Sequence, residues 1–148
     1  MIDLELKRQM ILDHYENPRN KVNDNKKLES YSIGHNDSPS CIDNIDAYVK
    51  IKNNKIEDVK FSGVGCAICT SSTDLMTLEI IGKDIKQAKK IIDNYISMIL
   101  MKPYDEKLLK AMAIYDNVNK QANRIKCAIT GVQAILKTIE NYEQKNKQ

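Results

Sequence analysis

The sequence contains no long apolar run and no apolar leader. About 20 consecutive apolar residues are needed to cross a bilayer, and no stretch of this 148-residue chain approaches that length. The opening residues are charged from the third position on and lack the apolar segment of a secretory signal. We therefore expect a cytoplasmic protein with no membrane partner.

Excess charge of one sign is also small. The net charge is +3, and arginine occurs only at positions 8, 19 and 124, whereas lysine is spread along the whole chain. Dispersed lysines are typical of a solvated surface and do not form the basic patch that nucleic acids require. The composition therefore favours no nucleic-acid partner.

Neither internal repeats nor a linker divides the chain, and its length suits a single domain over residues 1–148. Apolar and polar residues alternate over 45–51 and again over 56–61, which predicts two strands. The Asn53-Asn54 pair between them suits a tight turn, because asparagine tolerates positive φ. A third strand is expected near 31–37, which completes a small antiparallel sheet.

Helical periodicity dominates the rest of the chain. The pattern predicts a first helix over 3–15 with Asp3 as its N-cap, and Asp84 is expected to cap a later one. The other expected helices cover 67–81, 84–101, a shorter segment near 105–116, and a last helix starting around 124–127. With its strands early and its helices late, the chain is expected to have an α+β fold.

Four cysteines stand out, because thiols in the cytoplasm stay reduced and more often bind metals or react than form disulfides. Cys41 is expected in a loop before a strand, Cys66 at a strand-to-helix junction, and Cys127 in or near the first turn of the last helix. A helix N-terminus favours the anionic form of a nearby thiol. Asp43, two residues after Cys41, can add an oxygen ligand, which would complete a tetrahedral zinc shell.

The spacing of these residues does not decide between a metal site and packed thiols. It matches no compact zinc-finger pattern, and a buried cysteine behaves as a small hydrophobe. If four anionic ligands surround a divalent cation, Arg124 and Lys126 beside Cys127 would offset part of the remaining negative charge. Both readings stay open on the residues alone.

Four short segments, in order, resemble the motifs of one known family, the U-type iron–sulfur scaffold proteins (SufU, IscU and the NifU N-terminal domain). These segments are DHYENPRN at 13–20, SPSCID at 38–43, GVGCAI at 63–68 and RIKCA at 124–128. Lys126 stands where the IscU branch carries a histidine, and residues 105–120 look like an insertion of the SufU branch. The IscU chaperone-recognition motif is absent before Cys127. The chain therefore resembles the SufU branch.

This resemblance implies a small antiparallel three-stranded sheet with helices packed on one face. It also implies a zinc site on Cys41, Asp43, Cys66 and Cys127, with Cys41 accepting sulfur as a persulfide. The donor would be a pyridoxal-phosphate-dependent cysteine desulfurase of the SufS type, and the recipients would be a downstream iron–sulfur scaffold or apo-proteins. The chain would then be sulfurtransferase-like, a persulfide carrier rather than a conventional enzyme.

Two other functions remain open on the same residues. One is a scaffold on which iron or a [2Fe–2S] cluster is assembled, and the other is a structural zinc module that only binds a partner. Three positions depart from the family pattern: Ile42 replaces a glycine, Val64 replaces a polar residue, and Cys69 replaces a serine. Cys69 is expected to be a packed bystander, with an auxiliary ligand or a redox partner as the alternatives.

Overall fold

The computed structural model describes residues 3–23, 26–39 and 42–146. Within these ranges a three-stranded antiparallel sheet has the order β1-β2-β3 and consists of β1 (Ser32–Asp37), β2 (Asn44–Lys52) and β3 (Lys55–Val64). Asn53 and Asn54 have φ values of 53° and 65° and form the β2–β3 turn, as the asparagine pair predicts. The predicted sheet is therefore confirmed.

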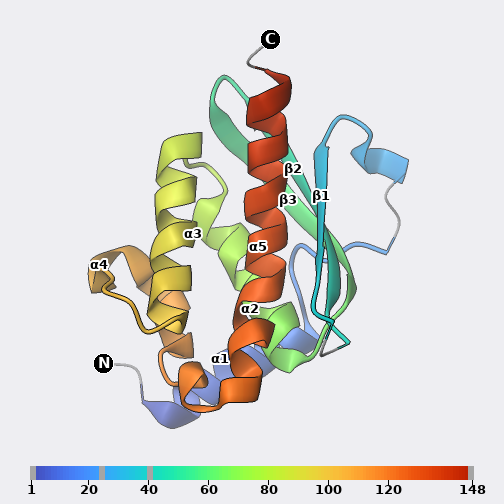
Figure 1. Cartoon of the computed structure of the whole chain (residues 1–148). Helices are drawn as coiled ribbons and strands as arrows, with labels where there is room; N and C mark the ends of the chain where they lie inside the picture. The colour runs from blue at the N-terminus through green and yellow to red at the C-terminus, as the bar shows by residue number, and fades with distance from the viewer. Residues whose placement is uncertain (1–2, 24–25, 40–41, 147–148) are drawn as a thin grey trace.

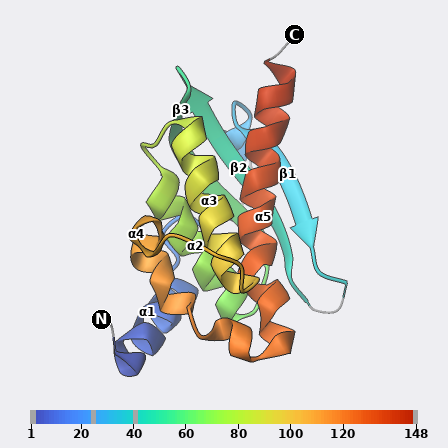
Figure 2. The same ribbon diagram turned by 60° about the vertical axis from the view of Figure 1, so that its left-hand side comes forward.

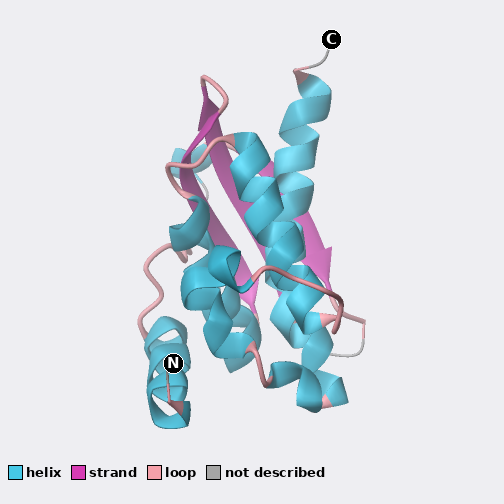
Figure 3. Cartoon of the chain, turned by 90° about the vertical axis from the view of Figure 1, so that its left-hand side faces the viewer, coloured by secondary structure: helices cyan, strands magenta, loops and turns pink. Residues whose placement is uncertain are grey.

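The long helices lie on one face of this sheet, as Figures 1 and 2 show from two directions. Figure 3 views the molecule with helices in front of the strands. The α-helices are α1 (Leu4–Glu16), α2 (Ala67–Ile80), α3 (Ile85–Ile99), α4 (Glu106–Leu109) and α5 (Ala122–Lys145). Three short 3-10 helices are η1 (Lys26–Leu28), η2 (Lys110–Tyr115) and η3 (Val118–Lys120). The expected α+β class is confirmed.

The apolar core forms where α2, α3 and α5 meet the inner face of the sheet. Ala47, Val59 and Phe61 point into it and are fully buried. The alternation of buried residues along β2 and β3 explains why one face of these strands accepts helices. α5 lies along β1 and β2, and α2 lies against β3.

Close packing between α2 and α5 brings together parts of the chain that carry two of the candidate ligands. Gly131 of α5 lies so near Thr73 of α2 that a Cβ at position 131 would collide with the threonine side chain. Cys127 lies one turn before Gly131, and α2 begins directly after Cys66. The helix pair therefore places Cys127 beside the start of α2.

Two helix boundaries differ from the sequence-based expectation. α5 begins at Ala122, before the expected start at 124–127, because the Arg124 N–H already donates to the Gln121 carbonyl at 2.9 Å. The segment near 105–116 is not one helix, since Lys110 takes φ 46°, ends the four-residue α4 and begins η2. The other expected helices are confirmed, with Asp3 and Asp84 as N-caps.

No helix in the described ranges is both long enough and apolar enough to span a membrane.

Candidate metal centre

Asp43 lies at the start of β2 with its carboxylate buried. Only 1% of the residue is exposed. Its Oδ1 accepts the backbone N–H of Cys66 at 3.0 Å, which ties the entry of β2 to the junction between β3 and α2. Its Oδ2 is the one buried side-chain oxygen or nitrogen among the described residues that has no hydrogen-bond partner. A buried carboxylate oxygen without a partner is costly unless a cation or another donor satisfies it.

Cys66 is the N-cap residue of α2. Its backbone is extended, and its Sγ accepts the N–H of Cys69 at 3.4 Å. The residue is half-buried. The Cys66 Sγ thus lies at the positive end of the helix dipole, with the Cys69 N–H directed at it. The expected position of Cys66 at a strand-to-helix junction is confirmed.

Cys127 lies in the second turn of α5, near the first turn as predicted, because α5 begins at Ala122. The residue is buried, and its Sγ lies 3.8 Å from the carbonyl oxygen of Asn123. Of the two thiols, only that of Cys66 therefore lies at a helix N-terminus.

Asp43, Cys66 and Cys127 converge from three separate segments. One ligand atom of each, a carboxylate oxygen and two Sγ atoms, lies within 4.8 Å of the others. Zinc bonds sulfur at about 2.3 Å and oxygen at about 2.0–2.2 Å, so its tetrahedral ligand atoms lie less than about 4 Å apart. A small rotation of these side chains would thus complete three corners of a tetrahedron. Cys41, the fourth predicted ligand, lies outside the described residues.

The two predicted charge-compensating residues precede Cys127 on α5 and are both exposed. The Arg124 Nε–H donates to the Gln121 side chain at 2.9 Å. Their role in offsetting the charge of a metal site stays a prediction.

Cys69 is fully buried beside this group. Burial is the main cause that raises the pKa of its thiol far above the ordinary value, and the nearby Asp43 and Cys66 raise it further. Contacts with the Gly131 backbone and the Thr73 hydroxyl act in the opposite direction but are weaker. Cys69 does not belong to the group of described residues that converge as candidate ligands.

The two other departures from the family pattern lie at the surface. Ile42 is 65% exposed and Val64 is 57% exposed. Ile42 directly precedes Asp43, and Val64 directly precedes Gly65, the glycine before Cys66. Apolar side chains therefore border the site where the family has a glycine and a polar residue.

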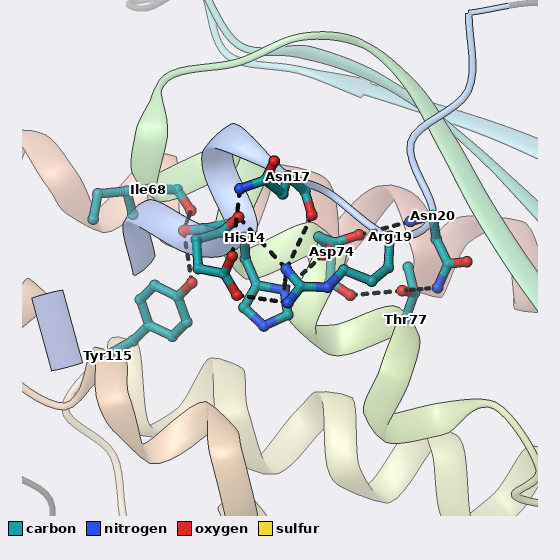
Figure 4. A network of polar contacts seen from close by, with 10 residues as sticks. His14, Asn17, Arg19, Asn20, Ile68, Asp74, Thr77 and Tyr115 are labelled. Atoms are coloured by element: carbon teal, nitrogen blue, oxygen red, sulfur yellow. Dashed lines mark hydrogen bonds and ion pairs between the residues drawn. The ribbon is translucent and has the colours of Figure 1, made fainter. Parts of the chain in front are cut away.

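The DHYENPRN segment contacts an aspartate in the middle of α2, the helix that begins directly after Cys66 (Figure 4). The His14 Nδ1–H donates to Asp74 Oδ2 at 2.7 Å, and the Asn20 N–H donates to Asp74 Oδ1 at 2.9 Å. Asn20 also donates to Thr77 through its side chain at 2.7 Å. Both His14 and Asp74 are buried. His14 is thus a structural residue that holds α1 and the following loop on α2.

Sequence reasoning did not single out Asp74. The available signal was an acidic residue in a stretch, 67–78, whose other residues are apolar, small or hydroxyl-bearing, together with a histidine in a recognised motif. His35, by contrast, lies on the surface as expected and pairs with the exposed Asp46 at 2.7 Å.

Two thiols and a half-satisfied buried carboxylate, gathered at the start of a helix beside a small antiparallel sheet, could together hold a metal ion. A family model described as the NifU-like N-terminal domain matches residues 6–148. The chain belongs to this family.

Named relatives span most of the chain. The zinc-dependent sulfurtransferase SufU of Bacillus subtilis is 36% identical over 144 residues, which cover 95% of this chain and 94% of that protein. The iron–sulfur cluster assembly scaffold protein IscU 1 of Archaeoglobus fulgidus is 29% identical and covers 92% of this chain and 76% of its own length.

A solved structure has the same fold. It is a crystal structure of a candidate iron–sulfur cluster assembly scaffold protein of the SUF system from Fervidobacterium islandicum. It superposes with a TM-score of 0.78 at 28% identity and covers 88% of this chain and 94% of that chain.

Proposed function

We propose that this chain is a zinc-dependent sulfur-transfer protein of iron–sulfur cluster assembly. Its zinc ligands would be Cys41, Asp43, Cys66 and Cys127. The observation that carries the proposal is the unpartnered Oδ2 of the buried Asp43 beside two thiols. An isolated buried charge is strongly unfavourable, whereas a cation bound there satisfies it. The likeness to a relative named as a zinc-dependent sulfurtransferase supports zinc as that cation.

The donor set fits zinc. Structural and reactive zinc sites use thiolates, imidazoles and carboxylates in a tetrahedron, and the described residues offer two sulfurs and one oxygen. Cys41, two residues before Asp43 in the sequence, would supply the fourth ligand. Bound zinc would keep the thiols deprotonated yet mask their reactivity. Arg124 and Lys126 would offset part of the negative charge that remains.

Cys41 would be the sulfur acceptor. The donor would be a persulfide on a pyridoxal-phosphate-dependent cysteine desulfurase of the SufS type. The Cys41 thiolate attacks the outer sulfur, the donor S–S bond breaks, and the desulfurase cysteine leaves as a thiolate, with no net oxidation. A downstream scaffold or an apo-protein would then take the sulfur. In this role the chain is a sulfurtransferase-like carrier and works in the cytoplasm.

A second function uses the same ligands to assemble a [2Fe–2S] cluster. The likeness to relatives named as IscU scaffold proteins favours it. Metal analysis of protein purified without oxygen separates the two functions. Near-stoichiometric zinc in a colourless protein supports sulfur transfer, whereas iron with acid-labile sulfide supports the scaffold.

The decisive experiment measures sulfide production by a SufS-type desulfurase, with a thiol reductant present, on adding this protein. Wild-type protein is expected to raise the turnover, and Cys41→Ala is expected to abolish the increase. Cys69→Ser is the matched control, because it changes a buried thiol outside the proposed ligand set, and it is expected to act like wild type.

Equal stimulation by the Cys41→Ala variant would contradict the role of Cys41 as acceptor. A zinc-bound wild-type protein that does not stimulate the desulfurase would instead favour a structural zinc module.

A further inference from the structure

The proposed function leaves one thiol beside the candidate metal centre without a role. Cys66 and Cys69 form a Cys-x-x-Cys pair at the start of α2, with Cys66 as N-cap and Cys69 in the first turn. The Cys69 N–H lies 3.4 Å from the Cys66 Sγ, so the two residues are already in contact. The pair combines a half-buried outer thiol with a fully buried inner one.

The Cys69 sulfur lies against the backbone that leads into Cys66. A Cβ added at Gly65 would be 3.1 Å from the Cys69 Sγ and 3.2 Å from its Cβ. Gly65 directly precedes Cys66, so the absence of a side chain at position 65 leaves the inner sulfur close to the outer residue. The two side chains are also neighbours, because helical residues three apart lie on the same side of the first turn.

We propose that Cys66 and Cys69 form a disulfide when a hydroperoxide oxidises the site, and that this disulfide releases the metal. The release rests on the proposed zinc-binding function, whereas the disulfide itself rests only on the placement of the two thiols. The pair would thus be an oxidation site that switches off sulfur transfer and that a thiol reductant restores.

The chemistry takes place in two balanced steps. The Cys66 thiolate attacks one peroxide oxygen, the O–O bond breaks, and a sulfenic acid and hydroxide form, the hydroxide taking up a proton to become water. The Cys69 sulfur then attacks the Cys66 sulfur, the S–O bond breaks, and the departing hydroxide takes the Cys69 proton as water. In total, two thiols are oxidised and one hydroperoxide is reduced to two waters when the oxidant is hydrogen peroxide.

Cys69 is a better partner for an oxidised Cys66 than Cys127. The proposed zinc ion would hold Cys127 as a ligand, whereas Cys69 lies outside the converging group. A disulfide also needs Cα atoms about 4.4–6.8 Å apart, and α-helix geometry places the Cα atoms of residues three apart at about 5 Å from each other. Loss of the Cys66 thiolate then removes one of four ligands and lowers the metal affinity.

Trypsin digestion without reduction tests the pairing directly. Cleavage after Lys60 and Lys83 gives peptide 61–83, which contains Cys66 and Cys69 and no other cysteine. Cys127 falls in peptide 127–137 and Cys41 in peptide 28–50. After brief treatment of the zinc-loaded protein with hydrogen peroxide, peptide 61–83 is expected to lose two hydrogen masses and to resist alkylation. A zinc-sensitive dye is expected to report zinc release over the same period.

The Cys69→Ser variant provides the matched control. It is expected to bind zinc like wild type but to leave oxidised Cys66 without its partner. The sulfenic acid then proceeds to sulfinic acid, which thiol reductants do not reverse. Recovery of zinc binding after reduction is therefore expected to fall at least about twofold relative to wild type.

A cross-link between peptide 61–83 and either of the other two cysteine peptides as the main product would overturn the pairing. So would sulfinic acid on Cys66 beside an alkylatable Cys69. The same digest on protein stripped of zinc separates the two proposals. If the disulfide forms but zinc never binds, the proposed function fails and the pairing stands. If zinc binds and is released without this disulfide, the pairing fails and the proposed function stands.

Discussion

Two buried aspartates, Asp74 and Asp43, differ in how many of their carboxylate oxygens accept hydrogen bonds. Asp74, in the middle of α2, uses both carboxylate oxygens: His14 donates to one and the Asn20 backbone to the other. Asp43, beside the start of α2, uses only one, for the Cys66 N–H, and its other oxygen has no partner. Burial is nearly the same, at 0% and 1% exposed. A satisfied buried acid indicates a structural anchor, whereas a half-satisfied one indicates a missing ligand.

Of the changes considered, removal of zinc is expected to change the free energy of unfolding most. A ligand that binds only the folded protein stabilises it by about 2.7 kcal/mol when its free concentration is 100 times its Kd. Chelation should lower the free energy of unfolding by about that amount, measured by urea denaturation with and without added zinc. The Asp43→Asn variant should show less than half of this difference. An equal zinc effect in the variant would remove Asp43 from the ligand set.

Asp74→Asn is expected to have the next largest effect. The amide cannot accept from both His14 and Asn20 as a charged group, and loss of a charge-assisted hydrogen bond at a buried site costs about 2 kcal/mol. Urea denaturation of the variant should show this loss equally with and without zinc. The number of zinc ions bound should stay unchanged. A variant that folds as stably as wild type would contradict the anchoring role of Asp74.

The same substitution at Asp43 is expected to act in the opposite direction in the metal-free protein. The amide oxygen can still accept the Cys66 N–H, and the charge that has no partner disappears. Removing an uncompensated buried charge should stabilise the zinc-free protein by about 1 kcal/mol, measured by the same denaturation. Zinc affinity should fall at the same time. If both Asp→Asn variants lose stability without zinc, the contrast between the two aspartates does not hold.

A third carboxylate, that of the partly exposed Asp58, is expected to contribute least to the stability of the fold. The Tyr31 hydroxyl donates to its Oδ2 at 2.6 Å. Burial first, and then this bond, raises the pKa of Tyr31 from 10.0 to about 12. Folding favours the neutral hydroxyl. Its contribution to the free energy of unfolding is therefore full below pH 10.0 and is lost as the pH rises toward about 12.

Tyr31→Phe should therefore cost less than about 1 kcal/mol at neutral pH. It should also remove part of the loss of stability above pH 10.0, the unshifted tyrosine value. Denaturation curves at neutral and alkaline pH check both expectations. If Tyr31→Phe lost more stability than Asp74→Asn, the contributions of these three carboxylates to stability would not follow their burial.

The sequence predicts the fold well where local signals agree. The Asn53-Asn54 turn, the Asp84 cap and the alternation in β2 and β3 each follow from short-range physics, and the structure has all three. The expected start of α5 was too late, because the residues from Ala122 on join the helix without a side-chain cap that would mark its first turn. The break at Lys110 depends on a positive φ, and position 110 has no glycine or asparagine from which a positive φ could be predicted.

The candidate site was predictable in its residues but not in its contacts. Family motifs point to Asp43, Cys66 and Cys127, and these three converge. Only one oxygen of Asp43 accepts a hydrogen bond because of the path that the chain takes at the β3–α2 junction. No local sequence pattern predicts this path. The same holds for Asp74, whose two partners are more than fifty residues away in the sequence.

The convergence of ligands from three segments also sets an order of events during synthesis. Asp43 and Cys66 leave the ribosome with the sheet and the start of α2, whereas Cys127 follows only with α5. If these residues are the ligands, the emerging chain carries only separate weak donors until α5 docks against α2. Metal acquisition is therefore expected to follow folding of the last helix, so that a chain holding zinc is one whose synthesis has passed α5.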